Sequence, residues 1–403
     1  MKTLLAFFCS GALLPLAAAL PVVTDVTLAT DTRGDVTVSY AVDADAIVTV
    51  DFLLDGEPVD PANLGRLSGA IGVPVKAGAA NVFRWLASLD LPDTRIDAAR
   101  LQARLTPFAP ASPPDYAVVS LLTNAPNPIV YYASTNHLPG GLFANAAYRT
   151  TKMVFRKIEA KGVEWLMGST GQSGRIAARE TPHFVTLDHD YYMGVFELTK
   201  AQYAALLGKE GRSGAAANNA DGWKFKPLER TPLAHVRGLD EEPVGAIGNL
   251  RARTGLAIDL PSEAEWEFAA RAGNDESHWP NGAPFFPSAT NVVVTSGGVT
   301  LGVSNPADQA CMSKTSDNGR TRDVGSFAPN VWGLYDVMGN VAEMCWDVYT
   351  GPGAVASGSR VTKGGHAASG YDWLRPASRD HYDPTLYKNE VGYRLRFVIP
   401  SGN

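Results

Sequence analysis

The stretch from Asn330 to Asp347, NVWGLYDVMGNVAEMCWD, constrains the fold of this chain more than any other. Gly333 and Gly339 can take backbone angles that are closed to other residues, so the chain can turn tightly between aromatic anchors. Side-chain oxygens follow at short spacing, on Asp336, Asn340 and Glu343. Oxygen ligands beside a glycine bend suit a hard cation such as calcium. The same spacing also suits a tight turn whose Asp and Asn side chains bond their own backbone.

The composition sets the size and class of the protein. The chain has 403 residues, which favours two domains, and its charged fraction of 19% is ordinary for a globular protein. The 39 glycines and 27 prolines favour loop-rich and β architecture over helical bundles. The formal charge of -6 leaves no basic footprint for nucleic acid. We therefore expect a partner other than DNA or RNA.

Residues 1–19 have the pattern of a secretory signal peptide. Lys2 supplies the charged start, Leu4–Leu16 the apolar segment and Ala17–Ala19 a small-residue cleavage site. The apolar run is short for a membrane span. Cys9 lies within it, without the small residues after it that a lipoprotein anchor needs. The sequence thus predicts a secreted or periplasmic protein without a membrane span.

Cys311 and Cys345 are the cysteines that remain after this segment. In an oxidising compartment they could form a disulfide bond. They could also be two buried thiols, because free cysteine packs as a small apolar side chain. The sequence leaves both states open.

Residues 20–107 carry the pattern of a β-sheet module. Apolar residues alternate with polar ones, or short strand-forming runs occur, at 35–40, 47–52, 81–85 and 99–105. Asp55-Gly56 is a hairpin turn signal. Strands at this spacing predict an all-β sandwich of immunoglobulin-like or fibronectin-like type. We expect a spacer or adhesion module, because no acid–base cluster is present.

A proline-rich stretch separates this module from the rest of the chain. Residues 108–150 are expected to be a linker and a surface lead-in, and 151–400 to be the second domain. A strand at 152–158 opens that domain. Two capping boxes, Thr199–Gln202 and Ser262–Glu265, predict helix starts, because side chains three residues apart can satisfy each other's free backbone donors.

The second of these helices concentrates acidic residues at its start. Glu263, Glu265 and Glu267 lie near the positive helix terminus, which stabilises each by a few tenths to about 1 kcal/mol. We therefore assign them a structural role and no catalysis.

Segments along the second domain together resemble the signature of the formylglycine-generating enzyme family, the sulfatase-modifying-factor domain. They are EWLMGS (164–169), YYMGVFELTKAQYAALL (191–207), DLPSEAEWEFAARAG (259–273), GLYDVMGNVAE (333–343), KGGHAASGYDWLRPASR (363–379) and VGYRLRF (391–397). As a set they are specific. The resemblance implies an irregular α+β domain of C-type-lectin-related fold, with little regular structure and bound calcium.

The resemblance also implies ligands for calcium. One ion would be held in the glycine loop by two side chains and two main-chain carbonyls, those of Asp336, Glu343, Gly339 and Val341. A second set of family positions corresponds to Asn291, Val292, Asp317 and Gly319. Oxygen donors of this kind are the ligands that calcium prefers.

The catalytic part of the family signature differs in this chain. Formylglycine formation in the family needs two cysteines after an RGGS motif, which hold copper(I), and soft thiolates select this ion. Here the motif reads KGGH, and Ser369 stands at the position of the first cysteine. No cysteine follows Cys345, and Ala342 stands where the family has a tryptophan. We therefore expect neither bound copper nor formylglycine oxidase activity.

The residues near that motif are the candidates for a remodelled groove: Ala342, His366, Ser369, Arg379 and His381. His366 and His381, with nearby carboxylates, could ligate a transition metal or serve acid–base chemistry. Histidines on loops are more often solvated or hydrogen-bonded structurally. Arg379 is expected to anchor the core by binding main-chain carbonyls.

Two hypotheses of function follow. The first is an exported binding or scaffold protein, whose calcium-stabilised second domain holds a peptide, protein or glycan in the groove. Trp332, Trp346, Tyr371 and Trp373 could stack on that ligand or fill the core. The second is an enzyme, either a formylglycine-generating enzyme acting on a sulfatase cysteine or another metal-dependent oxidase with a remodelled site. Intact fold signatures beside missing thiolates favour the first.

Overall fold

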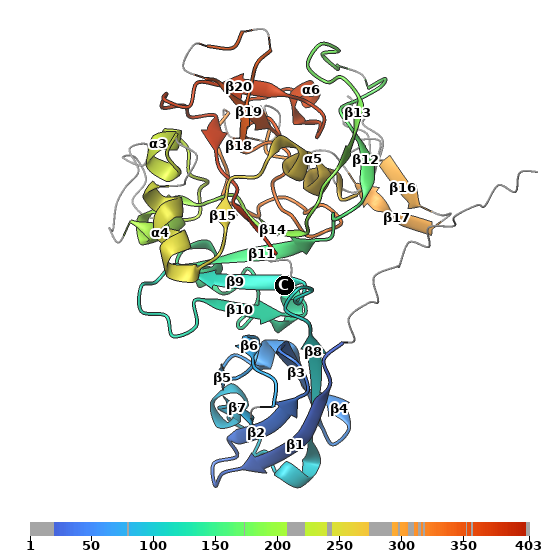
Figure 1. Ribbon diagram of the computed structural model, residues 1–403, viewed down its shortest axis with the longest axis vertical. Helices are drawn as coiled ribbons and strands as arrows, with labels where there is room; N and C mark the ends of the chain where they lie inside the picture. The colour runs from blue at the N-terminus through green and yellow to red at the C-terminus, as the bar shows by residue number, and fades with distance from the viewer. Residues whose placement is uncertain are drawn as a thin grey trace, which may run out of the picture.

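The computed structural model describes residues 20–78, 80–172, 174–207, 222–239, 244–273, 292–296, 299–304, 310–312, 316, 319–351, 353–355 and 358–399. Residues 1–19, which carry the expected signal peptide, lie outside this part of the chain. Figure 1 shows a smaller N-terminal body below a larger body, stacked along the long axis of the molecule.

The N-terminal body consists of two antiparallel β-sheets. One has the order β1-β2-β7-β5, and in the other β3 pairs with β4, β6 and β8. The strands are β1 (Val23–Thr30), β2 (Val36–Val42), β3 (Ala46–Leu54), β4 (Glu57–Pro58), β5 (Leu67–Gly69), β6 (Pro74–Val75), β7 (Asn81–Trp85) and β8 (Leu101–Phe108). Short helical turns lie between them, η1 (Pro61–Asn63), α1 (Ala87–Asp90) and η2 (Ala98–Arg100).

Side chains of the two sheets meet in one apolar core. Buried and partly exposed residues alternate along β2, as the period-two pattern predicted. Phe52 of β3 stacks on Trp85 of β7 with ring centroids 4.8 Å apart, so both sheets contribute to the same cluster. At the predicted hairpin turn, Asp55 and Gly56 both have positive φ angles, 54° and 87°, and Leu54 pairs with Glu57.

A six-stranded antiparallel sheet lies at the base of the larger body, in the order β10-β9-β11-β14-β22-β15. Its strands are β9 (Tyr116–Ser120), β10 (Ile129–Tyr132), β11 (Lys152–Ile158), β14 (Tyr191–Gly194), β15 (Ile258–Asp259) and β22 (Arg396–Val398). One prediction is corrected here. The stretch 108–150 is not merely a linker and lead-in, because it supplies β9 and β10 and the turns η3 (Thr135–His137) and η4 (Ala146–Arg149). Pairing with β11 is a long-range contact that local composition does not reveal.

A four-stranded sheet, in the order β20-β19-β18-β21, lies in the larger body. Its strands are β18 (Ala342–Val348), β19 (Arg360–Lys363), β20 (Asp380–Tyr382) and β21 (Val391–Gly392). Two hairpins complete the strands, β12 (Glu164–Met167) with β13 (His183–Thr186) and β16 (Val292–Ser296) with β17 (Val299–Ser304). In Figure 1, β18, β19 and β20 lie at the end of the larger body that is farthest from the N-terminal body.

The helices of the larger body are short. They are α2 (Lys200–Leu206), α3 (Leu233–Val236), α4 (Gly245–Thr254), α5 (Glu263–Arg271) and α6 (Tyr371–Leu374). Both predicted capping boxes are present, at the starts of α2 and α5. Across the described ranges, no helix has the length and apolar character that a membrane crossing requires. The fold is thus mostly β with few helices.

Helix α5 lies at the centre of the larger body, and strands β12, β14 and β18 pack around it. Trp266 packs in one apolar cluster with Trp165 of β12, Tyr191 of β14 and Cys345 of β18. Helices α2 and α4 contribute Leu206 and other side chains to a second cluster on the six-stranded sheet. The glycine-rich loop before β18, residues 333–341, packs against α5 through Leu334 and Val337.

Candidate functional site

The glycine-rich loop makes its bends where the sequence predicts them. Gly333 and Gly339 have φ angles of 82° and 84°. A Cβ atom on Gly339 would lie 2.1 Å from the Cys311 carbonyl oxygen, so no larger residue fits there. Asp336 and Asn340 also have positive φ angles, 55° and 61°, which Asp and Asn tolerate better than most residues. The loop therefore presses its backbone closely against a neighbouring segment.

Three carboxylates are buried behind this loop, those of Asp336, Glu343 and Glu197. Glu343 receives a bidentate ion pair from Arg394, and the Trp266 indole Nε1 donates to Glu343 Oε2 at 2.5 Å. Each of these carboxylates is at most 2% exposed, and so is Arg394. The cluster thus combines three acidic groups with one guanidinium.

Glu197 is a site residue that the sequence reasoning missed. It lies just after β14, and its carboxylate accepts from Asn340 Nδ2 at 2.6 Å and from the Val341 N–H at 3.2 Å. Its signal was available: a single glutamate in the apolar run VFEL, within one of the family segments. Such a buried acid needs a polar partner, and here the partner is the glycine-rich loop.

Burial, together with the neighbouring carboxylates, raises the pKa of two of these groups. Burial raises the pKa of Asp336 to about 7, with Glu343 adding to the effect. Burial, followed by the charges of Asp336 and Glu343, raises the pKa of Glu197 well above its usual value. The cluster therefore favours uptake of a positive charge, either a proton or a cation.

Asp336 also has a free ligand atom. Its Oδ2 accepts from the Gly325 N–H, so the side chain bonds a neighbouring segment and not its own turn. Its Oδ1 is buried without a hydrogen-bond partner in the described structure. This orphaned oxygen beside excess negative charge fits the calcium that the family implies. Nowhere in the described ranges do three His, Cys, Asp or Glu side chains come together in a way that would hold a metal ion. A cation here would thus need backbone carbonyls, and Gly339 and Val341 are the expected ones.

The second expected calcium set falls mostly outside the described part of the chain. Asn291 and Asp317 are not described, and neither is the side chain of Val292. Gly319 lies in a turn with a φ angle of 75°.

A pocket of about 200 Å³ opens beside the KGGH motif, at the far end of the larger body. Three of the predicted groove residues line it, Ala342, His366 and Ser369. The other side chains that matter chemically are Thr362, Trp373, Ser378, Asp380 and Tyr382. Strands β19 and β20, helix α6 and the loops that connect them thus bring hydroxyls, one imidazole, one indole and one carboxylate to a single pocket.

The polar groups of this pocket are mostly neutral. Burial lowers the pKa of His366, so its imidazole is uncharged near neutral pH. Burial raises the pKa of Tyr382 to about 12. The Ser369 hydroxyl accepts from the backbone N–H of His366 at 2.9 Å. The Thr362 Oγ1 is buried without a hydrogen-bond partner. The pocket therefore offers hydrogen bonds more than charge.

His381 does not share this pocket with His366. Asp380 and Tyr382 of β20 face the pocket, so the residue between them points to the opposite side of the strand. There the His381 ring stacks on Tyr349, with centroids 4.2 Å apart, and its Nε2 donates to the Gly353 carbonyl. The two histidines therefore do not form the metal or acid–base pair that the sequence suggested.

The core-anchoring role that we predicted for Arg379 belongs to Arg375. Arg375, and not Arg379, is the core anchor: it is 1% exposed, forms a bidentate pair with Glu180 at 2.6 and 2.8 Å, and donates to the Gly174 carbonyl. Arg379 is partly exposed and pairs with Glu263 at 2.8 Å. Sequence spacing could not distinguish them, because the partners come from distant segments.

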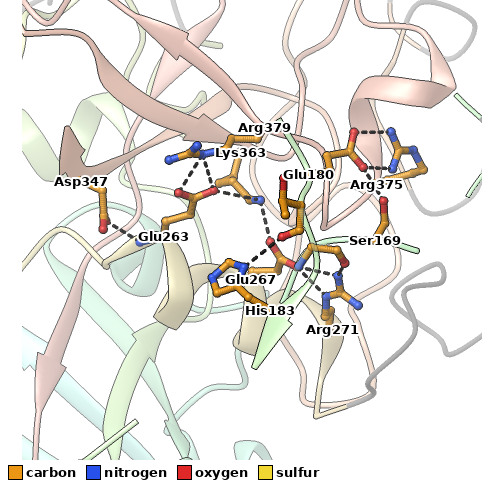
Figure 2. A network of polar contacts seen from close by, with 12 residues as sticks. Ser169, Glu180, His183, Glu263, Glu267, Arg271, Asp347, Lys363, Arg375 and Arg379 are labelled. Carbon is orange, nitrogen blue, oxygen red and sulfur yellow. Dashed lines mark hydrogen bonds and ion pairs between the residues drawn. The ribbon is translucent and has the colours of Figure 1, made fainter. Parts of the chain in front are cut away.

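Figure 2 shows that these contacts belong to one polar network around the start of α5. Lys363 pairs with Glu267 at 2.8 Å and lies 3.6 Å from Glu263, while Arg271 also pairs with Glu267. Each of these carboxylates has a cation beside it, as a structural network requires. Glu263 and Glu267 of α5 thus form ion pairs in this network, a role that the helix-terminus argument did not predict.

The two cysteines are part of the interior, and Trp332 and Trp346 pack against it. Cys311 and Cys345 are both free and buried, and neither lines the pocket. Burial raises the pKa of Cys311 to about 12 and that of Cys345 well above the usual range, so both remain thiols. Trp332 packs against the α5 cluster. Trp346 lies between two guanidiniums, with Arg237 3.2 Å and Arg360 3.9 Å from its ring centre.

Known proteins resemble this chain over its larger body. Residues 139–397 match the family described as sulfatase-modifying factor enzyme 1-like domain. A formylglycine-generating enzyme of Thermomonospora curvata is 35% identical over 120 residues, which are 26% of this chain and only 37% of that enzyme. The chaperone protein LppX of Paenibacillus barcinonensis is 25% identical over 242 residues, 52% of this chain and 81% of that protein.

Two further comparisons extend this picture. The Mus musculus protein named inactive C-alpha-formylglycine-generating enzyme 2 is 36% identical over 119 residues, 29% of this chain and 32% of that protein. Among solved structures, PvdO from Pseudomonas aeruginosa aligns with a TM-score of 0.46 at 21% identity, over 61% of this chain and 94% of that one.

Proposed function

The chain belongs to the family of sulfatase-modifying factor enzyme 1-like domains, and on this premise we propose that it is an exported binding protein and not a formylglycine-forming oxidase. The observation that carries the proposal is the lining of the pocket beside the KGGH motif. Ser369 brings a hydroxyl and His366 a neutral imidazole to this position. The pocket is thus built to form hydrogen bonds with a ligand.

Copper(I) does not fit this pocket. The ion prefers soft thiolate ligands, and the pocket wall offers hydroxyls, an imidazole and a carboxylate. Cys311 and Cys345 are held as thiols in the apolar interior. We therefore derive no oxidation step for this site.

The pocket is suited to one side chain of a peptide or one unit of a glycan. At about 200 Å³ it is smaller than the roughly 300–1,000 Å³ of sites for drug-sized ligands. Trp373 supplies a flat apolar face, and Asp380 a hydrogen-bond acceptor. The buried Thr362 Oγ1 gains a partner when a ligand fills the pocket. We favour a ligand with hydroxyl or amide groups and without a strong charge.

The names of two relatives are in line with a binding role. LppX is named a chaperone and covers about half of this chain, while the mouse protein is named an inactive formylglycine-generating enzyme. Both names describe those proteins, and we extend only the idea of binding without oxidation to this chain.

We further propose that calcium stabilises the glycine-rich loop. Asp336 and Glu343 would hold the ion with the carbonyls of Gly339 and Val341, and its charge would offset the excess of buried carboxylates. Glu343 accepts from Arg394 at both oxygens and from Trp266 at Oε2, so the ion would share this carboxylate with the guanidinium. Asn291, Val292, Asp317 and Gly319 remain the candidate set for a second ion.

The decisive experiment incubates the purified protein with a cysteine-containing sulfatase peptide, copper(I) and oxygen. We expect no aldehyde on the peptide by mass spectrometry, while an active formylglycine-generating enzyme in parallel forms it. Formation of aldehyde would refute the proposal. Binding is then measured on peptide and glycan arrays, with Trp373→Ala and Ser369→Ala as pocket variants and exposed Phe184→Ala as the control. We expect Trp373→Ala and Ser369→Ala to lose ligand binding and Phe184→Ala to retain it.

Elemental analysis separates this proposal from the enzyme alternative. We expect calcium in the purified protein and no stoichiometric iron, copper or zinc. A transition metal that is lost in His366→Ala would instead favour a metal-dependent oxidase.

A further inference from the structure

The two bodies of the molecule join through a tight backbone contact. The Tyr131 N–H donates to the Gly72 carbonyl at 2.7 Å, which sets β10 against the N-terminal body. Gly72 has a φ angle of +64°, and a Cβ atom there would lie 2.7 Å from the Tyr131 carbonyl oxygen. Only glycine fits at position 72, and its lack of a side chain lets the two backbones approach closely at the junction.

A histidine connects the two bodies at the same junction. His137 Nε2 lies 2.8 Å from Asp51 Oδ1 of β3, and its Nδ1 lies 2.8 Å from the Ser134 hydroxyl. In the neutral ring, Nε2–H donates to the carboxylate and Nδ1 accepts from the hydroxyl. His137 therefore bonds Oδ1 of the Asp51 carboxylate.

Beside these contacts lies a cavity of about 240 Å³ between the two bodies. Leu64, Leu67 and Ile71 line it from the N-terminal body, and Val130 lines it from β10. Cavities at domain interfaces, with apolar walls and a few polar groups, are preferred places for small ligands. This cavity shares no lining residue with the pocket beside the KGGH motif, whose strands β19 and β20 lie at the opposite end of the larger body in Figure 1.

Lys152 brings a positive charge to this cavity. It begins β11 and lines the cavity together with His137. Its Nζ lies 5.9 Å from the centre of the Tyr148 ring. In the described part of the chain no carboxylate lies within ion-pair distance of this ammonium. Asp51 instead contacts His137 through its Oδ1 atom. A cation without a counter-charge beside an apolar wall favours an anionic ligand.

We propose that this cavity binds a small carboxylate with an apolar chain. The carboxylate pairs with Lys152, and the chain lies against the leucines of the N-terminal body and Val130. Two sources share this chemistry, a free fatty acid of short chain and the C-terminal residue of a peptide that ends in an apolar side chain. Because both bodies supply the wall, the site is complete only in the joined molecule.

The test titrates the full chain by isothermal calorimetry with octanoate, with acetyl-Leu-Leu and with the neutral octanamide. We expect at least one of the two acids to bind and octanamide to bind at least about tenfold more weakly, because it cannot form the charged hydrogen bond. Lys152→Met should weaken the acid about tenfold or more. Lys161→Met removes the same charge from an exposed position outside the cavity and should leave the affinity unchanged.

The outcomes distinguish a free fatty acid from a peptide C-terminus and test the proposal itself. Binding of octanoate alone assigns a free acid, and binding of acetyl-Leu-Leu alone assigns a peptide terminus. Failure of both acids to bind overturns the proposal, as does equal affinity for octanamide or an unchanged affinity in Lys152→Met. If that variant is poorly folded, salt gives a second measurement on the wild type. Affinity for the acid should fall as salt rises while that for octanamide stays constant, and a constant acid affinity overturns the charge pairing.

Discussion

Arg394 forms a bidentate ion pair with Glu343, in which Nη2 lies 2.6 Å from Oε1 and Nε lies 2.9 Å from Oε2. Both side chains are buried. The same guanidinium donates to the carbonyls of Gly194, Val195 and Tyr335. The pair therefore connects β18, which carries Glu343, with the end of β14 and with the segment before β22. Because arginine stays charged in a protein, the removal of its partner leaves a buried charge without compensation.

Glu343→Gln should lower the free energy of unfolding by about 3–5 kcal/mol, the usual cost of breaking a buried ion pair from one side. Urea denaturation measures the loss, with and without chelator, because the pair itself does not depend on calcium. Glu164→Gln, at an exposed position of β12, should change the free energy by less than about 1 kcal/mol. An equally small effect of Glu343→Gln would contradict the role that we assign to this pair.

Calcium should raise the melting temperature of the wild type, because an ion that binds only the folded state stabilises it by mass action. The gain is about 2.7 kcal/mol when calcium exceeds its dissociation constant a hundredfold. Asp336→Ala removes the orphaned Oδ1 and should abolish the shift. Differential scanning calorimetry in calcium and in chelator measures both. A wild-type melting curve that chelator leaves unmoved rules out the proposed ion.

The pH dependence in chelator should carry the signature of Asp336. Burial raises its pKa to about 7, against about 4 in an unfolded chain. A carboxyl group with a raised pKa stabilises the folded state below the unfolded value, and this contribution is lost as the pH rises through the folded value. The wild type should therefore lose stability relative to Asp336→Asn between about pH 4 and pH 7.

Urea denaturation at several pH values measures that difference. Saturating calcium should suppress the loss, since the ion stabilises the charged form. Asp93→Asn, on the surface of the N-terminal body, should keep the wild-type slope. Parallel curves for the wild type and Asp336→Asn would show that this carboxyl does not titrate as described.

Gly339→Ala and Gly333→Ala form a matched pair, because their φ angles of 84° and 82° impose the same backbone strain. At Gly339 a Cβ atom would also lie 2.1 Å from the Cys311 carbonyl oxygen, whereas at Gly333 the nearest atom is the Tyr116 hydroxyl at 3.2 Å. We expect Gly333→Ala to cost about 1–3 kcal/mol and Gly339→Ala distinctly more. Equal losses in thermal denaturation would mean that the close approach to Cys311 is readily relaxed.

Local sequence determined much of the secondary structure. The alternation in 35–40, the hairpin at Asp55-Gly56 and the two capping boxes each depend on neighbouring residues, and each is present in the structure. The bends of the glycine-rich loop follow from Gly333 and Gly339 for the same reason. Steric limits on the backbone and hydrogen bonds over a few residues depend on the local sequence alone.

Tertiary structure alone decided which side chains share a site. Glu197 meets Asn340, and Arg375 rather than Arg379 enters the core beside Glu180, because distant segments bring their partners to them. His381 turns away from His366 because of the side of β20 on which it lies. The turns and the helix caps were thus determined by the sequence itself, because they depend on neighbouring residues. Burial and long-range pairing decided which charges face one another, since those energies depend on residues far apart along the chain.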